Sequence, residues 1–199
     1  MAELRFVPRS EFERIEGLGL KPAARAALFA TLCRINTLYM VARAGSGHLG
    51  SSFSSLDIVS WLYLNELHQG DASGDVYFSS KGHDAPGLYA VLLATGLLPF
   101  DRIHTLRRLG GLPGHPDVAT PGVVTNTGPL GMGISKAKGM ILANRLSGRQ
   151  GRVFVMTGDG ELQEGQIWES LARRPTGKWA SSRCWWITTR SSPTPTYPR

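Results

Sequence analysis

Acidic residues are missing from the end of this 199-residue chain, although they are common elsewhere. Residues 173–199 hold six Lys and Arg residues and no Asp or Glu, while the whole chain has a formal net charge of +7. Residues 1–172 therefore carry a net charge of only +1. Nucleic-acid binding needs a basic face spread over a folded domain. We therefore expect no nucleic-acid partner.

Cysteine and long apolar runs are also scarce. Cys33 and Cys184 have neither the spacing of a zinc site nor that of a disulfide framework. We expect Cys33 to be a buried, unreactive residue of a cytoplasmic protein. No run of 18 apolar residues is present, so no membrane partner is expected. Charged residues throughout the first 17 positions argue against a signal peptide.

The chain does contain an alternation of helix-like and strand-like segments. Short apolar runs predict strands at 75–80 and 152–160, the second buried on both faces of a parallel sheet. Ser55 is the predicted N-cap of a helix and Gly96 the predicted C-cap of another. The alternation predicts an α/β fold, a doubly wound and mostly parallel sheet with helices on both faces. Helical spacing of apolar residues predicts helices over 22–43, 55–67, 83–96, 100–110, 132–148 and 162–172.

The turn after the second predicted strand, "TGDGELQEG", places Asp159 between Gly158 and Gly160. The two glycines let a phosphate group approach the backbone, and the N-terminus of the next helix favours anions. Asp159 would join Mg²⁺ to a pyrophosphate, because Mg²⁺ binds through few carboxylates together with phosphates. The alternative is a tight turn in which Asp159 only caps the next helix.

Three histidines lie in glycine-rich loops: His48 in "GSGHLG", His83 in "SSKGHDAPG" and His115 in "GLPGHPD". A histidine can orient phosphates, donate to a developing oxyanion or move protons near neutral pH. Each could instead be a structural residue.

The Gly- and Pro-rich segment 110–131 is too long for a simple connector, which is typical of a functional loop. In its "NTGPLGMG", Gly128 and Gly131 would let the main chain approach a ligand. Alternatively, Pro129 simply starts a helix.

Taken together, five ordered motifs resemble one family: "SGHLGSSFSSLDIVSWLY", "SSKGHDAPGLYAVLLATG", "GLPGHPD", "TPGVVTNTGPLGMGIS" and "GDGELQEGQIWES". They are similar to the N-terminal, diphosphate-binding domain of transketolase, from about Leu28 to Leu171. The resemblance implies thiamine diphosphate, Mg²⁺ or Ca²⁺, and two-carbon ketol transfer from a ketose phosphate to an aldose phosphate. The "GHPD" and "GPLG" loops favour transketolase over deoxyxylulose-phosphate synthase and dehydrogenase-type thiamine enzymes.

The resemblance also implies residue roles. His48 and His115 match catalytic residues that contact substrate hydroxyls and stabilise charge on the two-carbon unit. Asp159 matches a metal ligand, and Glu164 an acidic residue in the network joining two active sites of a dimer. One departure is Leu49, since transketolases usually have Pro after this His. The residues matched to cofactor contacts are His83, Gly158 and Gly160 at the diphosphate and Gly128, Pro129 and Leu130 around the aminopyrimidine ring.

Two expected parts of such an enzyme are not found in the sequence. One is the pyrimidine-binding domain, with the glutamate that activates the cofactor ring. We therefore expect a homo-oligomer when intact, or an N-terminal subunit working with a separate C-terminal subunit. The other is a second metal ligand, an Asn in a "D-x-N" stretch. The alternative is a non-catalytic truncated product.

The unusual composition of 173–199 is what a shifted reading frame would produce. In the shifted frame, each new codon joins the third base of one codon to the first two bases of the next. The codons of Cys184–Ile187 then encode Leu-Val-Asp, whichever synonymous codons are used. The following codons can be chosen so that the shifted frame reads "LVDHNKIQSDTYV". We therefore interpret 1–172 as the N-terminal part of the thiamine diphosphate-binding domain and 173–199 as an out-of-frame, non-native tail. The sheet would then be incomplete, with an unpaired edge. The alternative is a divergent but genuine tail.

The gene sequence tests this interpretation. We expect one nucleotide lost, or two gained, between the codons of Leu171 and Pro175. The shifted frame should then encode the "D-x-N" stretch and stay open downstream of codon 199. A shifted frame that closes within the tail would contradict the interpretation.

Overall fold

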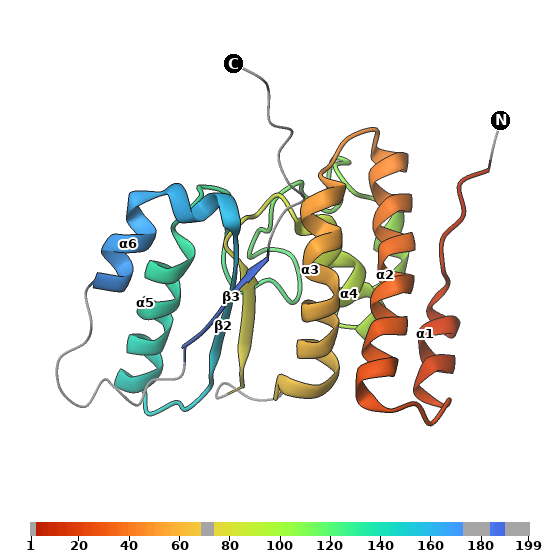
Figure 1. Cartoon of the computed structure of the whole chain (residues 1–199). Coiled ribbons are helices and arrows are strands. Elements are labelled where there is room, and N and C mark those ends of the chain that lie inside the picture. The colour runs from red at the N-terminus through yellow and green to blue at the C-terminus, as the bar shows by residue number, and fades with distance from the viewer. Residues whose placement is uncertain (1–2, 69–73, 173–183, 190–199) are drawn as a thin grey trace, which may run out of the picture.

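The computed structural model describes residues 3–68, 74–172 and 184–189 (Figure 1). Helices make up most of it, and three short strands run through its middle. In chain order the elements are α1 (Arg9–Glu16), α2 (Pro22–Ala44), α3 (Leu49–Trp61), a π-helical turn (Leu62–Glu66), β1 (Val76–Ser79), α4 (Ala85–Thr95), a 3-10 turn (Phe100–His104), α5 (Gly133–Leu146), β2 (Val153–Gly158), a 3-10 turn (Asp159–Gln163), α6 (Gly165–Ala172) and β3 (Cys184–Thr189).

The three strands form a parallel sheet in the order β1-β2-β3. Val76 pairs with Val153, and Val153 pairs with Cys184 on the other side. The predicted α/β class and parallel sheet are confirmed. The described strands follow one another in chain order, so the reversal that defines a doubly wound sheet is not seen among them.

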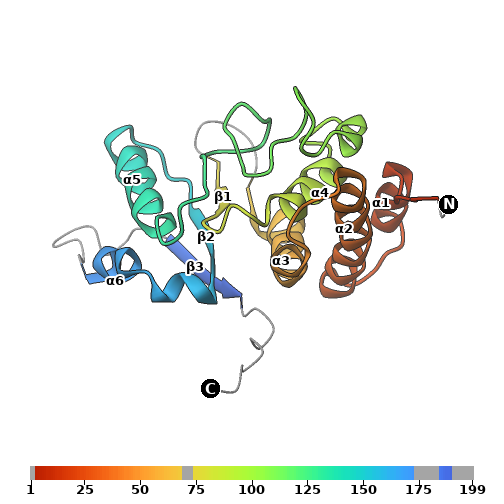
Figure 2. The same cartoon turned by 90° about the horizontal axis from the view of Figure 1, so that it is seen from above.

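Helices cover both faces of the sheet (Figure 2). Successive strand residues point to opposite faces. Tyr77 and Met156 therefore join the core formed with α2, α3 and α4, whereas Phe78 and Val155 pack with Ala137 of α5 on the other face. The prediction of helices on both faces is confirmed.

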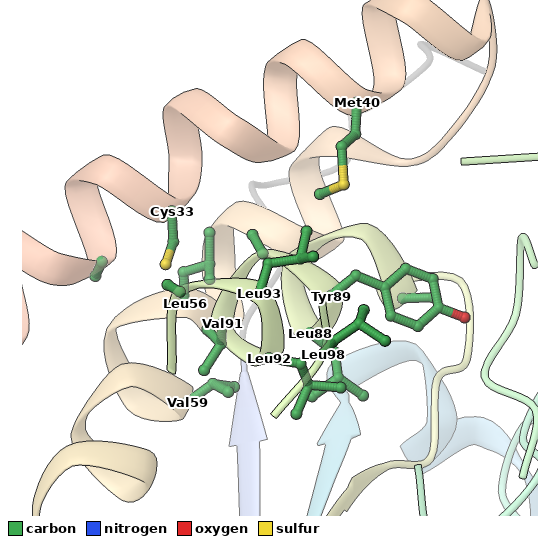
Figure 3. Close-up of a cluster of buried hydrophobic side chains, with 14 of the residues drawn as sticks. Cys33, Met40, Leu56, Val59, Leu88, Tyr89, Val91, Leu92, Leu93 and Leu98 are labelled. Carbon is green, nitrogen blue, oxygen red and sulfur yellow. The ribbon is translucent and has the colours of Figure 1, made fainter. Parts of the chain in front are cut away.

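The larger core centres on α4, which is buried along its whole length (Figure 3). Leu88, Leu92 and Leu93 pack against leucines, valines and Met40 from the neighbouring helices. Cys33 is fully buried here, and this burial raises the pKa of its thiol well above the ordinary value. It is a core residue, as predicted.

Two predicted caps have different outcomes. Gly96 ends α4 in the left-handed conformation, with φ of 78°, as predicted. Ser55 is not an N-cap, because α3 begins six residues earlier at Leu49. The Ser55 hydroxyl donates instead to the carbonyl of Ser52 at 2.9 Å. Serine can bond back to the preceding turn in this way, so the "SSFSS" stretch remains helical.

Three other boundaries differ from the prediction. α1 was not predicted, and the helix expected over 100–110 is only the short turn Phe100–His104. Arg107 has a positive φ of 56°, which ends any helical continuation. α5 begins at Gly133, so Pro129 does not start a helix and the segment around it is a loop.

The expected unpaired edge next to β2 is wrong, because β3 pairs with β2 over six residues. Its sequence, "CWWITT", is rich in aromatic and β-branched residues, which favour strands. β3 also lies where the alternative reading frame would encode a strand. Residues 173–183 and 190–199 lie outside the described residues, so the frame interpretation stays a prediction. Among the described residues, no helix is long and apolar enough to span a bilayer.

Candidate functional site

A pocket of about 220 Å³ lies at the carboxyl ends of β1 and β2. Ligands of open α/β sheets bind at this edge. Four segments that are distant in sequence meet there: the residues after β1, the residues after β2, the first turns of α3 and the loop before α5. The lining residues are Ser51, Ser54, Lys81, His83, Leu130, Gly158, Asp159, Gly160 and Glu161.

The carboxylate of Glu161 joins three of these segments from a buried position. Its Oε1 accepts from the Ser80 hydroxyl at 2.5 Å and from the Gly131 N–H at 2.8 Å. Its Oε2 accepts from the Gly158 N–H at 2.8 Å. Ser80 in turn accepts from the Gly133 N–H at 3.0 Å. The pocket walls are therefore held by hydrogen bonds to a charged acceptor, which are the stronger kind.

Glycine at two positions allows the loops to approach one another. Gly82 has a φ of 67°, and a Cβ atom there would lie 2.8 Å from the Gly128 nitrogen and 2.9 Å from Cδ2 of His115. A Cβ atom on Gly131 would lie 2.7 Å from Cβ of Glu164. Any larger residue at these positions would push the loops apart.

A buried ion pair lies beside the pocket. Lys81 Nζ is 3.3 Å from Asp84 Oδ2, and the two side chains are 4% and 3% exposed. The Ser79 hydroxyl donates to the same carboxylate at 2.7 Å, and Lys81 also donates to the Ser51 carbonyl at 3.2 Å. The pocket wall therefore includes a cation that is held away from bulk water.

Ser51 provides a second polar group. Its Oγ is buried and has no hydrogen-bond partner among the described residues. An unpaired buried hydroxyl is costly unless a ligand or water completes it. The pocket thus has this hydroxyl and the Lys81 ammonium group beside the carboxylates of Asp159 and Glu161.

The three loop histidines take different positions. The rings of His48 and His83 meet edge to face, with centroids 5.1 Å apart. Burial lowers the pKa of His83, and His48 and Lys81 lower it further, while Asp84 opposes the shift. His115 is exposed, and its carbonyl accepts from the Tyr89 hydroxyl at 3.3 Å.

The structure gathers most of the predicted site residues. His48 touches the ring of His83 at the pocket margin, and His115 lies with Gly128 against Gly82. Pro129 lies in the same loop between Gly128 and Leu130. Glu164 packs on Gly131 and does not line the pocket. Their roles stay predictions. The predicted residues that line the pocket are His83, Leu130, Gly158, Asp159 and Gly160.

Sequence reasoning missed Ser51, Lys81 and Glu161. Lys81 stands two residues before His83 in "SSKGHD", and a charged residue next to a buried strand was the available signal. Glu161 gave no such signal, because it looks like an ordinary first-turn acid of the next helix.

Asp159 offers one carboxylate for a metal ion. Its Oδ1 accepts from the Gly160 N–H at 3.0 Å. Within the parts of the chain that the structure describes, no group of three His, Cys, Asp or Glu residues could hold a metal. The single carboxylate of Asp159 fits Mg²⁺, because this ion takes few carboxylates when phosphates supply the other oxygens.

These features define an α/β domain with a polar pocket at the carboxyl edge of a parallel sheet. Residues 26–175 match the family model described as "Transketolase, thiamine diphosphate binding domain". The chain therefore belongs to the transketolase family, within its thiamine diphosphate-binding domain.

Two curated relatives are about twice as long as the matched region. The chain is 40% identical over 131 residues to an apulose-4-phosphate transketolase subunit from Actinobacillus succinogenes, covering 62% of this chain and 48% of that protein. It is 38% identical over 148 residues to the 6-deoxy-6-sulfo-D-fructose transketolase subunit SqwG of Clostridium sp. (strain MSTE9), covering 71% and 54%. The chain thus spans about half the length of these relatives.

A solved structure is also similar. The transketolase of Leishmania mexicana superimposes with a TM-score of 0.67 at 30% identity, covering 74% of this chain and 25% of that one. The match agrees with the α/β architecture seen here.

Replacing Glu161 with Ala should destabilise the pocket region. The Ser80 hydroxyl and two backbone N–H groups would lose their acceptor, and we expect a loss of about 3 kcal/mol in the free energy of unfolding. Urea denaturation, monitored by circular dichroism, measures this free energy of unfolding. Gln163→Ala, in the same turn but exposed, is the control. Equal stability of the two variants would contradict the role given to Glu161.

The lowered pKa of His83 predicts that the free energy of unfolding depends on pH. The unfolded chain takes up the proton near the ordinary histidine pKa of about 6.5, and the folded chain only at lower pH. The free energy of unfolding should therefore fall as the pH drops through this interval, and His83→Gln should reduce the slope. NMR titration of the imidazole measures the pKa directly. A value at or above the ordinary one would refute the prediction.

Proposed function

We propose that this chain forms the cofactor-binding part of a thiamine diphosphate- and metal-dependent transketolase. The intact enzyme would move a two-carbon ketol group from a ketose phosphate to an aldose phosphate. The observation that carries the proposal is the pocket at the strand ends, where Lys81 and the "GDG" turn meet. The family membership supports the same cofactor.

In this proposal, the pocket holds the diphosphate. Lys81 supplies the positive charge, and the unpaired Ser51 hydroxyl donates a hydrogen bond. Gly158 and Gly160 allow close approach, and the Asp159 carboxylate binds Mg²⁺ or Ca²⁺ beside the phosphates. His83 is uncharged at neutral pH, because burial lowers its pKa, and can donate one hydrogen bond to a phosphate oxygen.

The neighbouring loop would hold the aminopyrimidine ring. Gly128, Pro129 and Leu130 would surround the ring, and this is supported by the close approach of Gly128 to Gly82 and by Leu130 in the pocket lining. Bound thiamine diphosphate supplies a nucleophilic carbon that accepts the ketol unit. His48 and His115 would bind the sugar hydroxyls and stabilise developing negative charge.

The substrates are proposed to carry an anionic group. The names of the two curated relatives include a sugar phosphate and a sulfonated sugar. A phosphorylated ketose and aldose are therefore the substrates to test first.

A partner subunit is proposed because both relatives are named as subunits. The partner would carry the pyrimidine-binding domain and the glutamate that activates the cofactor ring. Glu164 would join the acidic network between paired active sites, and the sheet of the complete domain would be doubly wound.

Calorimetric titration of thiamine diphosphate with Mg²⁺ tests the proposal. The titration uses this chain and the chain with its reading frame restored, each mixed with the partner subunit. We expect Asp159→Ala and Lys81→Met each to weaken binding at least about tenfold, or 1.4 kcal/mol. Asp101→Ala, on the exposed turn after α4, is the matched control and should bind normally.

Two results would overturn the proposal. Absence of cofactor binding by both chains with the partner would favour a non-catalytic product. Products formed from pyruvate, with none from xylulose 5-phosphate, would favour an enzyme resembling deoxyxylulose-phosphate synthase.

A further inference from the structure

Asp84 is a buried carboxylate to which the proposed reaction gives no role. Its Oδ2 lies 3.3 Å from Nζ of Lys81, and the two side chains are 3% and 4% exposed. The Ser79 hydroxyl donates to the same oxygen at 2.7 Å. The other oxygen, Oδ1, is buried without a hydrogen-bond partner among the described residues. Buried ion pairs are weak evidence for stability, so this pair is better explained by its effect on the pocket.

The Lys81 side chain is fixed in the pocket wall along its whole length. A Cβ atom on Gly158 would lie 3.0 Å from Cδ and 3.3 Å from Cγ of Lys81, so the glycine lets the lysine stem cross the end of β2. At the far end, Nζ donates to the Ser51 carbonyl in the first turn of α3 at 3.2 Å. Asp84 meets the side chain at this same end. The position of the ammonium group is therefore set by three separate contacts.

Carboxylates outnumber cations around the pocket. Lys81 lines it together with Asp159 and Glu161, and Asp84 pairs with Lys81 from outside the lining. With His83 uncharged, one ammonium group and three carboxylates give these groups a formal charge of −2. Because Asp84 already offsets Lys81, the charges of the two lining carboxylates are not compensated. An anion that brings no cation with it would be repelled.

The charge of Asp84 also acts on the pocket lining. Burial is the largest cause of the lowered pKa of His83. Among the charged neighbours, Asp84, which raises this pKa, has a larger effect than Lys81, which lowers it together with His48. Since His83 lines the pocket, the negative member of the ion pair has the stronger influence at that point.

From these contacts and charges, we propose that Asp84 is the counter-ion of Lys81 and makes the pocket select a metal-complexed diphosphate over the bare anion. This assignment rests on the proposed function, in which the pocket receives the diphosphate. A divalent ion that enters with the phosphates offsets the carboxylates of Asp159 and Glu161, and the repulsion is removed. Asp84 acts through Lys81 from outside the pocket lining, so it is a positioning residue.

A purely structural role for Asp84 would have the opposite effect on binding. If Asp84 only held Lys81 in place, its loss would weaken the binding of every anion, with or without metal. If Asp84 offsets the charge of Lys81, its loss should strengthen binding. The gain should be largest for the ligand with the most negative charge, because the Coulomb energy is proportional to that charge. Bare pyrophosphate carries more negative charge than its Mg²⁺ complex.

Calorimetric titration of the full chain with inorganic pyrophosphate, in EDTA and in Mg²⁺, separates the two roles. We expect the parent chain to prefer the Mg²⁺ complex. Asp84→Asn should tighten the binding of bare pyrophosphate at least about tenfold and reduce this preference. Asp101→Asn, on the exposed turn after α4, changes the net charge equally and should have no effect. Circular dichroism checks that both variants are folded. Unchanged or weaker binding of bare pyrophosphate by Asp84→Asn would overturn the proposal.

The same titration in a Lys81→Met background tests whether Asp84 acts through Lys81. Here Asp84→Asn should bring no gain, because the gain is due to the ammonium group left without its counter-ion. A tenfold gain that persists without Lys81 would show that Asp84 repels the anion directly, and it would reject the counter-ion assignment.

The salt dependence of the unmodified chain gives a test that needs no variant. When Asp84 offsets Lys81, added NaCl should not weaken the binding of bare pyrophosphate, because no net attraction is present to be screened. Steep weakening by salt would indicate an uncompensated cation and overturn the proposal. A parent chain that fails to bind pyrophosphate even with Mg²⁺ would overturn the proposed function as well. A parent chain that binds, with no change in Asp84→Asn, rejects the role of Asp84 alone.

Discussion

The carboxylate of Glu161 is the constraint on which the site depends. Three donors from three segments converge on it: the Ser80 hydroxyl, the Gly131 N–H and the Gly158 N–H. Gly158 is the last residue of β2, whereas Ser80 and Gly131 lie outside helices and strands, so strand pairing fixes only one of the three segments. A buried charged acceptor holds all three, because each donor would be costly to leave unpaired there.

Charge placement sets what the pocket can bind. The Lys81–Asp84 pair is almost fully buried, so neither group is screened by water as a surface pair would be. One Asp84 oxygen binds Lys81 and Ser79, while the other has no hydrogen-bond partner among the described residues. The carboxylate thus holds the ammonium group near the pocket. The lowered pKa of His83 in the same region is consistent with a partly dry environment, because burial is the largest cause of the shift.

The pocket edge of the sheet and the α2 side of the molecule differ in composition. At the strand ends, short polar loops meet around the pocket and are held by hydrogen bonds. On the far side of α4, α2 packs its inner residues into the core and leaves an apolar stripe outside. The helical layer between them has the buried helix α4 at its centre, and it also buries polar side chains such as Asn36, Thr37 and Ser52. Close packing of this kind keeps the pocket walls rigid.

Local patterns in the sequence determined the α/β class, the buried β2 strand, the Gly96 cap and the burial of Cys33, because each depends on residues close together along the chain. The "GDG" turn and the histidine loops were visible for the same reason. The sequence could not show that Ser55 lies within a helix, or that Cys184–Thr189 pairs with β2. Only the tertiary structure decided that Ser51, Lys81 and Glu161 share one pocket and that Leu28, Ile35 and Leu38 of α2 are exposed in the described part of the chain. Such features arise when distant segments meet, and a local pattern carries no information about that meeting.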